Sequence, residues 1–156
     1  MTRLVPVVVL LAALALCGCK AKAPTKAESK LMSDLKHGVF IGNKKLKNPL
    51  PATPQTIADG RQAFWYYCAA CHGLDGQNTG VPFADRMAPP VPSLASAEVQ
   101  EYTDGQLKTV IEDGVSPSGM PASRGILSDE EIWSIVMFLR HLPKPGSLGE
   151  PEMYSH

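Results

Sequence analysis

The sequence predicts an all-α fold, built from three helices and one long loop. Each predicted helix carries apolar residues three and four positions apart, which is the spacing of a helix face that packs on a core. Two of the helices begin with a capping box, a reciprocal pair of side-chain to backbone hydrogen bonds in the first turn. No segment of convincing length alternates between apolar and polar residues, so we expect no β-strands.

The first helix is predicted over about residues 57–67, where Gly60 and Phe64 lie four apart on one face. It leads directly into two closely spaced cysteines and a histidine. The segment that follows, residues 73–94, is rich in glycine and proline and is predicted to be a loop. Loops of this length without regular structure are usually functional.

The start and end of the second and third helices are predicted from residues that favour helix termini. The capping boxes pair Thr103 with Gln106 and Ser128 with Glu131. The second helix should end at Gly114, because glycine favours a helix terminus, and the third should end before Pro143, because proline cannot continue a helix.

Cys68, Cys71 and His72 form a Cys-x-x-Cys-His motif at the end of the first predicted helix. Two cysteines at this spacing can present both sulfurs to the vinyl groups of one porphyrin, and the adjacent imidazole can bind the iron. The motif therefore predicts one covalently attached haem c. Cys68 and Cys71 are the predicted thioether anchors, and His72 is the predicted axial ligand of the iron.

Two other kinds of site share part of this pattern. A thioredoxin-like redox pair also contains Cys-x-x-Cys, but it belongs near a βαβ unit, and no strands are predicted here. A zinc site usually needs four ligands, and the sequence has no second Cys-x-x-Cys and no paired histidines downstream. The pattern favours haem over both.

Residues 1–18 are typical of a bacterial lipoprotein signal peptide. Arg3 precedes an apolar run over residues 4–16, which is shorter than the about 20 residues of a transmembrane helix. The sequence Leu-Cys-Gly-Cys that ends at Cys19 resembles a lipobox and predicts lipid attachment to Cys19. The alternative is an ordinary signal peptide with incidental cysteines.

Charge is unevenly distributed along the chain. Residues 20–47 hold eight lysines and two carboxylates, a net charge of +6, whereas residues 48–156 hold six basic and thirteen acidic residues, a net charge of −7. We expect residues 19–55 to form a basic flexible tether, residues 56–143 a haem domain and residues 144–156 a C-terminal tail. The tether could approach anionic lipid headgroups or could simply be solvated.

Methionine together with histidine is a common axial pair in electron-transfer haems. Of the six methionines, Met120 lies in a Ser-Gly-Met-Pro turn between the second and third helices. There glycine permits close approach and proline fixes the chain behind the sulfur, so Met120 is the predicted second ligand of the iron. Met87, in a proline-bounded loop, is the alternative, and its other role would be packing on the haem edge.

These motifs, over about residues 57–142, resemble a class I monohaem cytochrome c. The segments that carry the resemblance are Gly60-Arg61-x-x-Phe64 before the haem motif, Gly119-Met120-Pro121, and Leu127 to Arg140. The resemblance implies a small cytochrome c fold, in which the N-terminal and C-terminal helices cross around one covalently bound haem. Gly60 and Phe64 would then pack against the apolar stripe around Ile135. The resemblance also implies that the haem is attached outside the cytoplasm.

The family uses a proline carbonyl after the haem motif to accept the N–H of the proximal imidazole, which fixes the orientation of the ring. The resemblance points to Pro82 first and to Pro90 second. The family's usual Gly-Pro dipeptide is interrupted here, because Val81 separates Gly80 from Pro82. Candidates for contact with the haem propionates are Arg86, Arg124 and Trp133, and a surface role is equally open for the two arginines.

We therefore expect an electron carrier and not an enzyme. It would transfer single electrons between partners of a bacterial respiratory chain, anchored to the periplasmic side of the inner or outer membrane through Cys19. The acidic haem domain predicts protein partners with basic docking faces, and no nucleic-acid partner is expected.

Two alternatives remain open. The chain could be a subunit of a larger respiratory assembly, since lipid-anchored monohaem cytochromes that resemble it occur in the quinol-oxidising alternative complex III. A haem enzyme or sensor would need an open iron position, and Met120 argues against one.

Overall fold

The computed structural model describes residues 42–43, 45–116 and 118–154, all of which belong to the unit formed by residues 34–156. The predicted signal peptide, Cys19 and the tether as far as residue 41 lie outside the described residues. Within the described ranges, secondary structure is helical apart from two isolated bridges, Val115–Met120 and Arg124–Leu127. In the same ranges no helix is long and apolar enough to cross a membrane.

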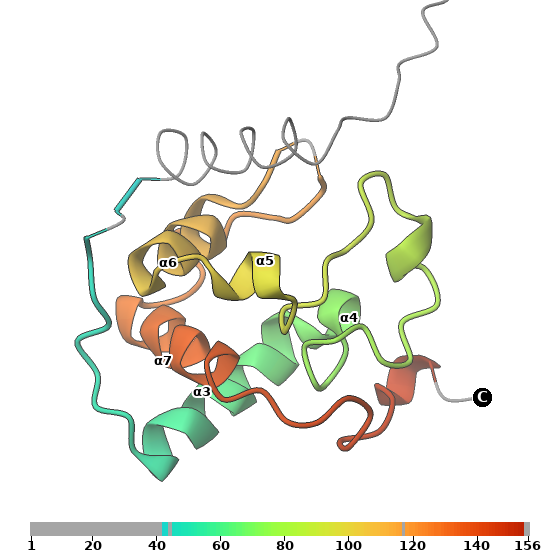
Figure 1. The fold of residues 1–156 in the computed structure, drawn as a ribbon, viewed down its shortest axis with the longest axis horizontal. Helices are drawn as coiled ribbons and strands as arrows, with labels where there is room; N and C mark the ends of the chain where they lie inside the picture. The colour runs from blue at the N-terminus through green and yellow to red at the C-terminus, as the bar shows by residue number, and fades with distance from the viewer. Residues whose placement is uncertain (1–41, 44, 117, 155–156) are drawn as a thin grey trace, which may run out of the picture. The chain divides into compact units, whose positions relative to one another are not determined.

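Figure 1 shows the arrangement of the helices. In chain order they are α3 (Pro54–Tyr67), α4 (Ala69–His72), the 3-10 turn η2 (Ala84–Arg86), α5 (Ala97–Gln100), α6 (Asp104–Asp113), α7 (Asp129–Leu139) and the 3-10 turn η3 (Glu152–Tyr154). The three long helices α3, α6 and α7 are the three that the sequence predicts, so the all-α fold class is confirmed. The four short elements escape prediction because three or four residues carry no readable periodicity.

The ends of the long helices follow from local side-chain chemistry. Both predicted capping boxes are present, at the start of α6 and at the start of α7. Helix α3 begins three residues earlier than predicted, at Pro54. The cause is Thr53, whose side chain accepts a hydrogen bond from the Thr56 N–H at 3.1 Å, while Pro54 occupies the first helical position, where no N–H is needed.

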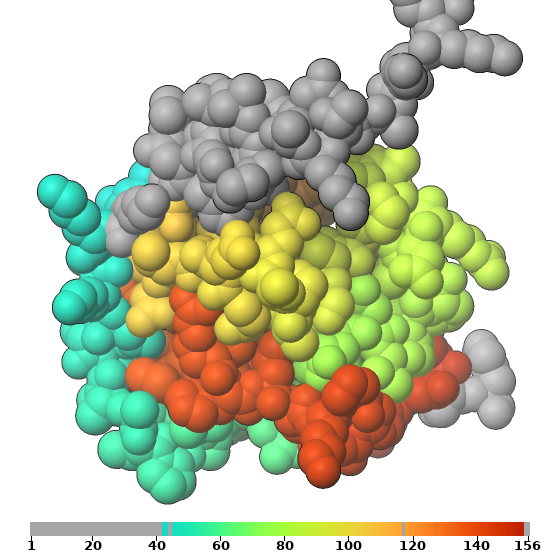
Figure 2. All heavy atoms as spheres, viewed as in Figure 1, coloured from blue at the N-terminus to red at the C-terminus, as the bar shows by residue number. Residues whose placement is uncertain are grey.

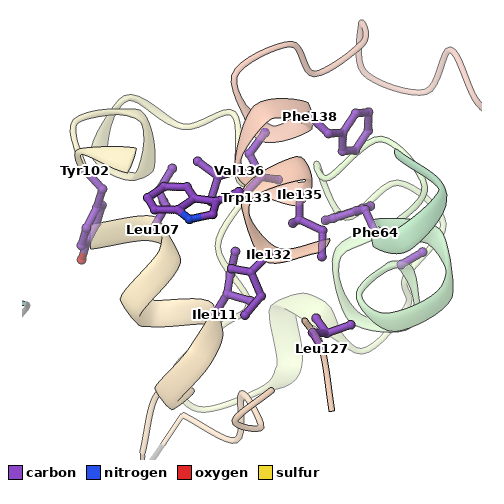
Figure 3. Close-up of a cluster of buried hydrophobic side chains, with 12 residues drawn as sticks. Phe64, Tyr102, Leu107, Ile111, Leu127, Ile132, Trp133, Ile135, Val136 and Phe138 are labelled. Carbon is purple, nitrogen blue, oxygen red and sulfur yellow. The ribbon is translucent and has the colours of Figure 1, made fainter. Parts of the chain in front are cut away.

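Helices α3 and α7 cross at Gly60, as the resemblance implies. A side chain on Gly60 would collide with the backbone carbonyl of Ser134, so the two helix backbones are in direct contact. One turn further along, the rings of Phe64 and Phe138 pack with their centroids 5.2 Å apart. Figure 3 shows these two rings facing each other across the crossing. The predicted crossing of the terminal helices is confirmed.

The hydrophobic core surrounds α7, which packs on α3 along one side and on α6 along another (Figures 1 and 3). All but the first three residues of α7 are buried, so this helix has no long solvent face. The core side chains of the three long helices are Phe64, Leu107, Ile111, Ile132, Trp133, Ile135, Val136, Phe138 and Leu139. Helix α7 is therefore the central helix of the core, and α3 and α6 both pack against it.

Arg140, the residue that ends α7, joins three elements. Its guanidinium donates to the Asp104 carboxylate at 2.9 Å, to the Gln100 carbonyl at 3.0 Å and to the Tyr102 carbonyl. These acceptors lie at the end of α5, in the connection and at the start of α6. Arg140 therefore fixes the α5–α6 corner against the C-terminal end of α7.

We expect Arg140→Met to lower the free energy of unfolding by about 2–3 kcal/mol, because several half-buried acceptors would lose their donor. Denaturant unfolding of the holoprotein would measure the change. Arg124→Met is the matched control, because its guanidinium pairs with Asp113 on the exposed surface and should contribute little. Equal stability losses in the two variants would contradict this account of Arg140.

The end of the predicted tether packs on the folded domain. The Asn48 side chain donates to the carbonyl of Trp133 at 2.9 Å, and the Gly105 N–H donates to the carbonyl of Leu46 at 3.1 Å. Leu50 packs against the core cluster. The packed domain therefore begins before residue 56, where the sequence pattern places its boundary.

Candidate functional site

The Cys-x-x-Cys-His motif forms a single helical turn at the end of α3. The N–H of Cys68 still donates to Phe64 at 2.8 Å, so α3 runs directly into the motif. The N–H groups of Cys71 and His72 then both donate to the carbonyl of Cys68, at 3.1 and 3.0 Å. Residues three and four apart share one side of a helical turn, so Cys68, Cys71 and His72 lie on a common face.

The His72 imidazole lies in an apolar setting. Its ring centroid is 6.5 Å from that of Phe64, which α3 also supplies. Burial lowers the pKa of His72 to about 4, and the Pro92 carbonyl offsets only part of this effect. The imidazole is therefore neutral at pH 7, which is the form that can bind a metal.

Pro92 is the proline whose backbone carbonyl acts on the His72 ring, where it raises the pKa of the imidazole. Pro82, the first choice from the resemblance, and Pro90, the second, are not the prolines found at this place. The reason lies in the path of the loop. The Asn78 side chain donates to the carbonyl of Val91 at 2.8 Å, which draws the Val91–Pro92 segment to the haem motif.

Asp75 organises the first turns of this loop. Its carboxylate is fully buried, at 0% exposure, and it accepts hydrogen bonds from the Gln77 N–H at 2.8 Å, the Thr79 hydroxyl and the Gly146 N–H at 2.7 Å. Burial by itself raises the pKa of Asp75, but these donors outweigh it and the pKa is lowered overall. The sequence pattern gave no signal for Asp75 beyond its place in a glycine-bounded turn.

The lowered pKa makes the contribution of Asp75 to stability dependent on pH. Because the folded-state pKa lies below the ordinary value of 3.8, this contribution is complete above about pH 4 and is lost as the pH falls through the folded-state pKa. We expect Asp75→Asn to be less stable than wild type at pH 7, and the difference to shrink below pH 4. Urea unfolding across this pH range would measure it. If the difference in unfolding free energy between the two proteins stays constant down to pH 2, the lowered pKa of Asp75 is contradicted.

Met120 and Met87, the two candidate methionines, belong to neighbouring turns. Met120 is half-buried against the core cluster, and its carbonyl accepts the Val115 N–H at 3.1 Å. A Cβ built on Gly119 would lie 3.5 Å from the terminal methyl carbon of Met87. Met87 therefore packs beside the Met120 turn, a proximity that the sequence pattern does not reveal. Met120 as an iron ligand stays a prediction.

Of the three candidates for propionate contact, Arg124 and Trp133 have other partners. Arg124 forms an exposed ion pair with Asp113 at 2.5 Å, and Trp133 is buried in the core, where Lys108 lies over its ring. Arg86 is exposed in η2. Arg124 therefore fits the surface role that the sequence left open.

Sequence reasoning missed an aromatic hollow on α3, next to the motif. Trp65, Tyr66 and Tyr67 line it together with the carboxylates of Asp59 and Glu131. Tyr66 is 82% exposed, although it is a large aromatic residue. The run Trp-Tyr-Tyr directly before the first cysteine was the available signal.

The side chains of the motif fit a covalently bound haem. The His72 Nδ1 atom is buried without a hydrogen-bond partner, and the Pro92 carbonyl is the backbone acceptor that acts on this ring. Both cysteines are free, with Cys71 exposed and Cys68 half-buried. Burial, and then the charge of Cys71, raise the pKa of the Cys68 thiol to about 12. A haem bound here would supply a one-electron redox centre.

The competing kinds of site gain no support from the described parts of the chain. There, no three His, Cys, Asp or Glu side chains gather as a metal-binding group. The motif also lies between helices, without the strands that a thioredoxin-like unit contributes.

Fold and motif together define a small c-type cytochrome domain. Residues 55–139 match the family model described as cytochrome C oxidase, cbb3-type, subunit III. This match covers more than half of the chain, so the chain belongs to this family of monohaem cytochrome c domains. Cytochrome c domains bind haem c covalently and transfer electrons. No curated protein matches the chain.

Proposed function

We propose that this chain is a lipid-anchored c-type cytochrome that passes single electrons between partners of a bacterial respiratory chain. The observation that carries the proposal is the helical turn that presents Cys68, Cys71 and His72 on one face, at the end of a helix packed tightly on the core. In this proposal the two thiols hold the haem through thioether bonds, and His72 and Met120 are the axial ligands.

Each part of the chain has a distinct task in this function. Helix α3 positions the anchoring thiols, and its contact with α7 keeps that position fixed while the charge of the iron changes. The neutral His72 imidazole provides a nitrogen lone pair, and the Pro92 carbonyl orients the ring. Phe64 and Phe138 exclude water from the side of the motif that faces the core. No substrate bond is made or broken, so the chain acts as a carrier.

Covalent haem attachment is tested with chain expressed alongside a haem-attachment system. We expect haem to stay with the wild-type polypeptide under denaturing electrophoresis. Cys68→Ala together with Cys71→Ala should lose it, while Cys17→Ala in the signal region serves as the matched control. Haem that stays covalently attached in the double variant would overturn the proposed anchors. A reduced spectrum of five-coordinate high-spin iron in the wild type would favour a haem enzyme or sensor instead.

The proposed anchor is Cys19, which lies outside the described residues. Its support is the lipobox-like sequence that ends at this cysteine. We expect Cys19→Ser to release the cytochrome from periplasm-facing membranes into the soluble fraction, whereas Cys17→Ser should leave it membrane-bound. A fully membrane-bound Cys19→Ser protein would overturn the lipid anchor.

A second candidate function is that of a subunit in a larger respiratory complex. It is favoured by the family description, which names a subunit of a cytochrome c oxidase. Purification of the native protein in mild detergent separates the two candidates. Co-purifying oxidase or quinol-oxidising subunits would support the complex, and a monomeric cytochrome would support the free carrier.

The aromatic hollow of α3 suits a partner with basic side chains. Its carboxylates attract cations, and the exposed Tyr66 ring can pack against lysine or arginine, as the Trp65 ring already packs against Arg61. Electron transfer to such a partner should slow as ionic strength rises. A rate that does not depend on salt would contradict this part of the proposal.

A further inference from the structure

The C-terminal segment, residues 143–154, packs on the haem motif and on the loop that follows it. We call this segment the C-terminal strap and residues 73–94 the proximal loop. The Tyr154 hydroxyl donates to the carbonyl of Ala70, between the two motif cysteines, at 3.1 Å. The Gln77 side chain donates to the carbonyl of Pro143 at 2.9 Å. Figure 2 shows the strap in red against the green surface of this region.

Apolar contacts support these hydrogen bonds. The rings of Tyr154 and Phe83 meet edge to face, with centroids 5.9 Å apart, and Pro151 is buried. The Glu150 side chain lies directly over Gly80, so closely that a Cβ there would come within 2.5 Å of its Cγ atom. The strap is therefore bound along much of its length and is part of the folded domain.

Asp75 is the junction between the strap and the proximal loop. One carboxylate oxygen accepts the Gln77 N–H, and the other accepts both the Thr79 hydroxyl and the Gly146 N–H of the strap. A buried carboxylate needs all of these donors, because an unpaired charge is strongly disfavoured away from water. Release of the strap would remove one donor and force the turn at Asp75 to rearrange.

The turn at Asp75 is continuous with the contacts of the proximal ligand. Asn78, which lies between Gln77 and Thr79, donates its N–H to the carbonyl of His72 at 2.8 Å. Its side chain holds the Val91 carbonyl at 2.8 Å, one residue before Pro92. The Leu94 N–H donates to Gly76 at 2.8 Å and fixes the same segment from its other side. Every link from Gly146 to Pro92 is a hydrogen bond or a neighbouring residue.

We propose that the C-terminal strap is a positioning element for the proximal haem ligand, acting through Asp75 on the turn that holds the His72 carbonyl and on the Val91–Pro92 segment, whose Pro92 carbonyl would accept the His72 ring N–H once haem is bound. This inference rests on the proposed function, in which His72 binds the iron. A carbonyl that accepts the imidazole N–H makes the ring a stronger donor to iron and favours the ferric state. Loosening of the strap should therefore raise the reduction potential.

The experiment compares four haem-loaded variants with the wild-type protein. The first is truncated after Lys144, the second is Asp75→Asn, and the third combines the two changes. The fourth is the full-length double variant Glu150→Gln and Glu152→Gln, which loses the same carboxylates as the truncation but keeps the strap. The measurements are the midpoint potential and, by NMR of the ferrous protein, the hydrogen exchange rate of the His72 ring N–H.

We expect truncation and Asp75→Asn each to raise the potential and to speed exchange of the His72 N–H by about tenfold, the effect of losing one hydrogen bond. The combined variant should exchange no faster than either single variant, because both act on one linkage. The charge-matched control should leave the exchange rate unchanged. The proposal would be overturned if the His72 N–H exchanged at the wild-type rate in both the truncated and the Asp75→Asn proteins. It would also be overturned if the two changes had fully additive effects on that rate.

Tyr154→Phe keeps the test possible if the truncated chain does not fold. It removes only the hydroxyl bond to Ala70 and keeps the ring against Phe83, so the His72 N–H should exchange faster in a stable domain. Exchange at the wild-type rate in this variant would then count against the strap. Failure of the proposed function would give a different result, because the wild-type protein itself would then lack covalently attached haem or a low-spin spectrum.

Discussion

Met120→Ala is expected to leave the haem attached and to lower the reduction potential. The sulfur of methionine stabilises ferrous iron relative to harder ligands, and axial ligands set haem potentials over roughly 0.8 V, so a fall on the order of 0.1 V or more is expected. The weak near-infrared band that arises from the sulfur–iron bond should also disappear. Potentiometric titration and near-infrared absorption of the ferric protein would measure the two effects.

Met87→Ala is the matched control, because the Met87 side chain reaches the same turn, beside Gly119. We expect it to preserve both the potential and the near-infrared band, with a modest loss of stability from the lost packing. The reverse result, with the band lost in Met87→Ala and kept in Met120→Ala, would assign the ligand to Met87.

Gly60→Ala is expected to destabilise the fold by about 3 kcal/mol or more, because the new methyl group would collide with the Ser134 carbonyl and push α3 away from α7. Helix propensity alone predicts the opposite sign, since alanine in a helix interior is favoured over glycine by about 1 kcal/mol. The collision should prevail, because backbone cannot move aside as a flexible side chain does. Thermal unfolding of the ferric holoprotein would measure the result.

Gln62→Ala, on the exposed side of the same helix, is the control for Gly60→Ala and should change the melting temperature little. A Gly60→Ala protein that melts at or above the wild-type temperature would show that the helices can separate without cost.

The long helices were predictable from the sequence because their signals are local. The pairs Thr103–Gln106 and Ser128–Glu131 each span one helical turn, and the apolar stripe of α7 repeats within a single segment. The Cys-x-x-Cys-His motif was recognisable for the same reason, since its two cysteines and its histidine lie within five residues. Gly60 was placed at the crossing by the resemblance, and its contact with Ser134 explains why a glycine suits that position.

The position of Pro92 near the His72 ring could not be read from the sequence. It depends on the hydrogen bond from the Asn78 side chain to Val91, which joins residues thirteen positions apart and follows no periodic pattern. The packing of the strap was hidden in the same way. Its main bonds use the Gly146 N–H and the Ala70 carbonyl, and backbone groups leave no trace in a pattern of side chains.

The strap also bears on how the cytochrome matures. Its bond from Tyr154 to Ala70 joins residues 84 positions apart, and contacts of such long range tend to form late in folding. Synthesis delivers residues 143–154 after the motif, so the Ala70 carbonyl lacks its Tyr154 partner until those residues arrive. The order of synthesis therefore leaves an interval in which haem could be attached before the strap packs beside Ala70.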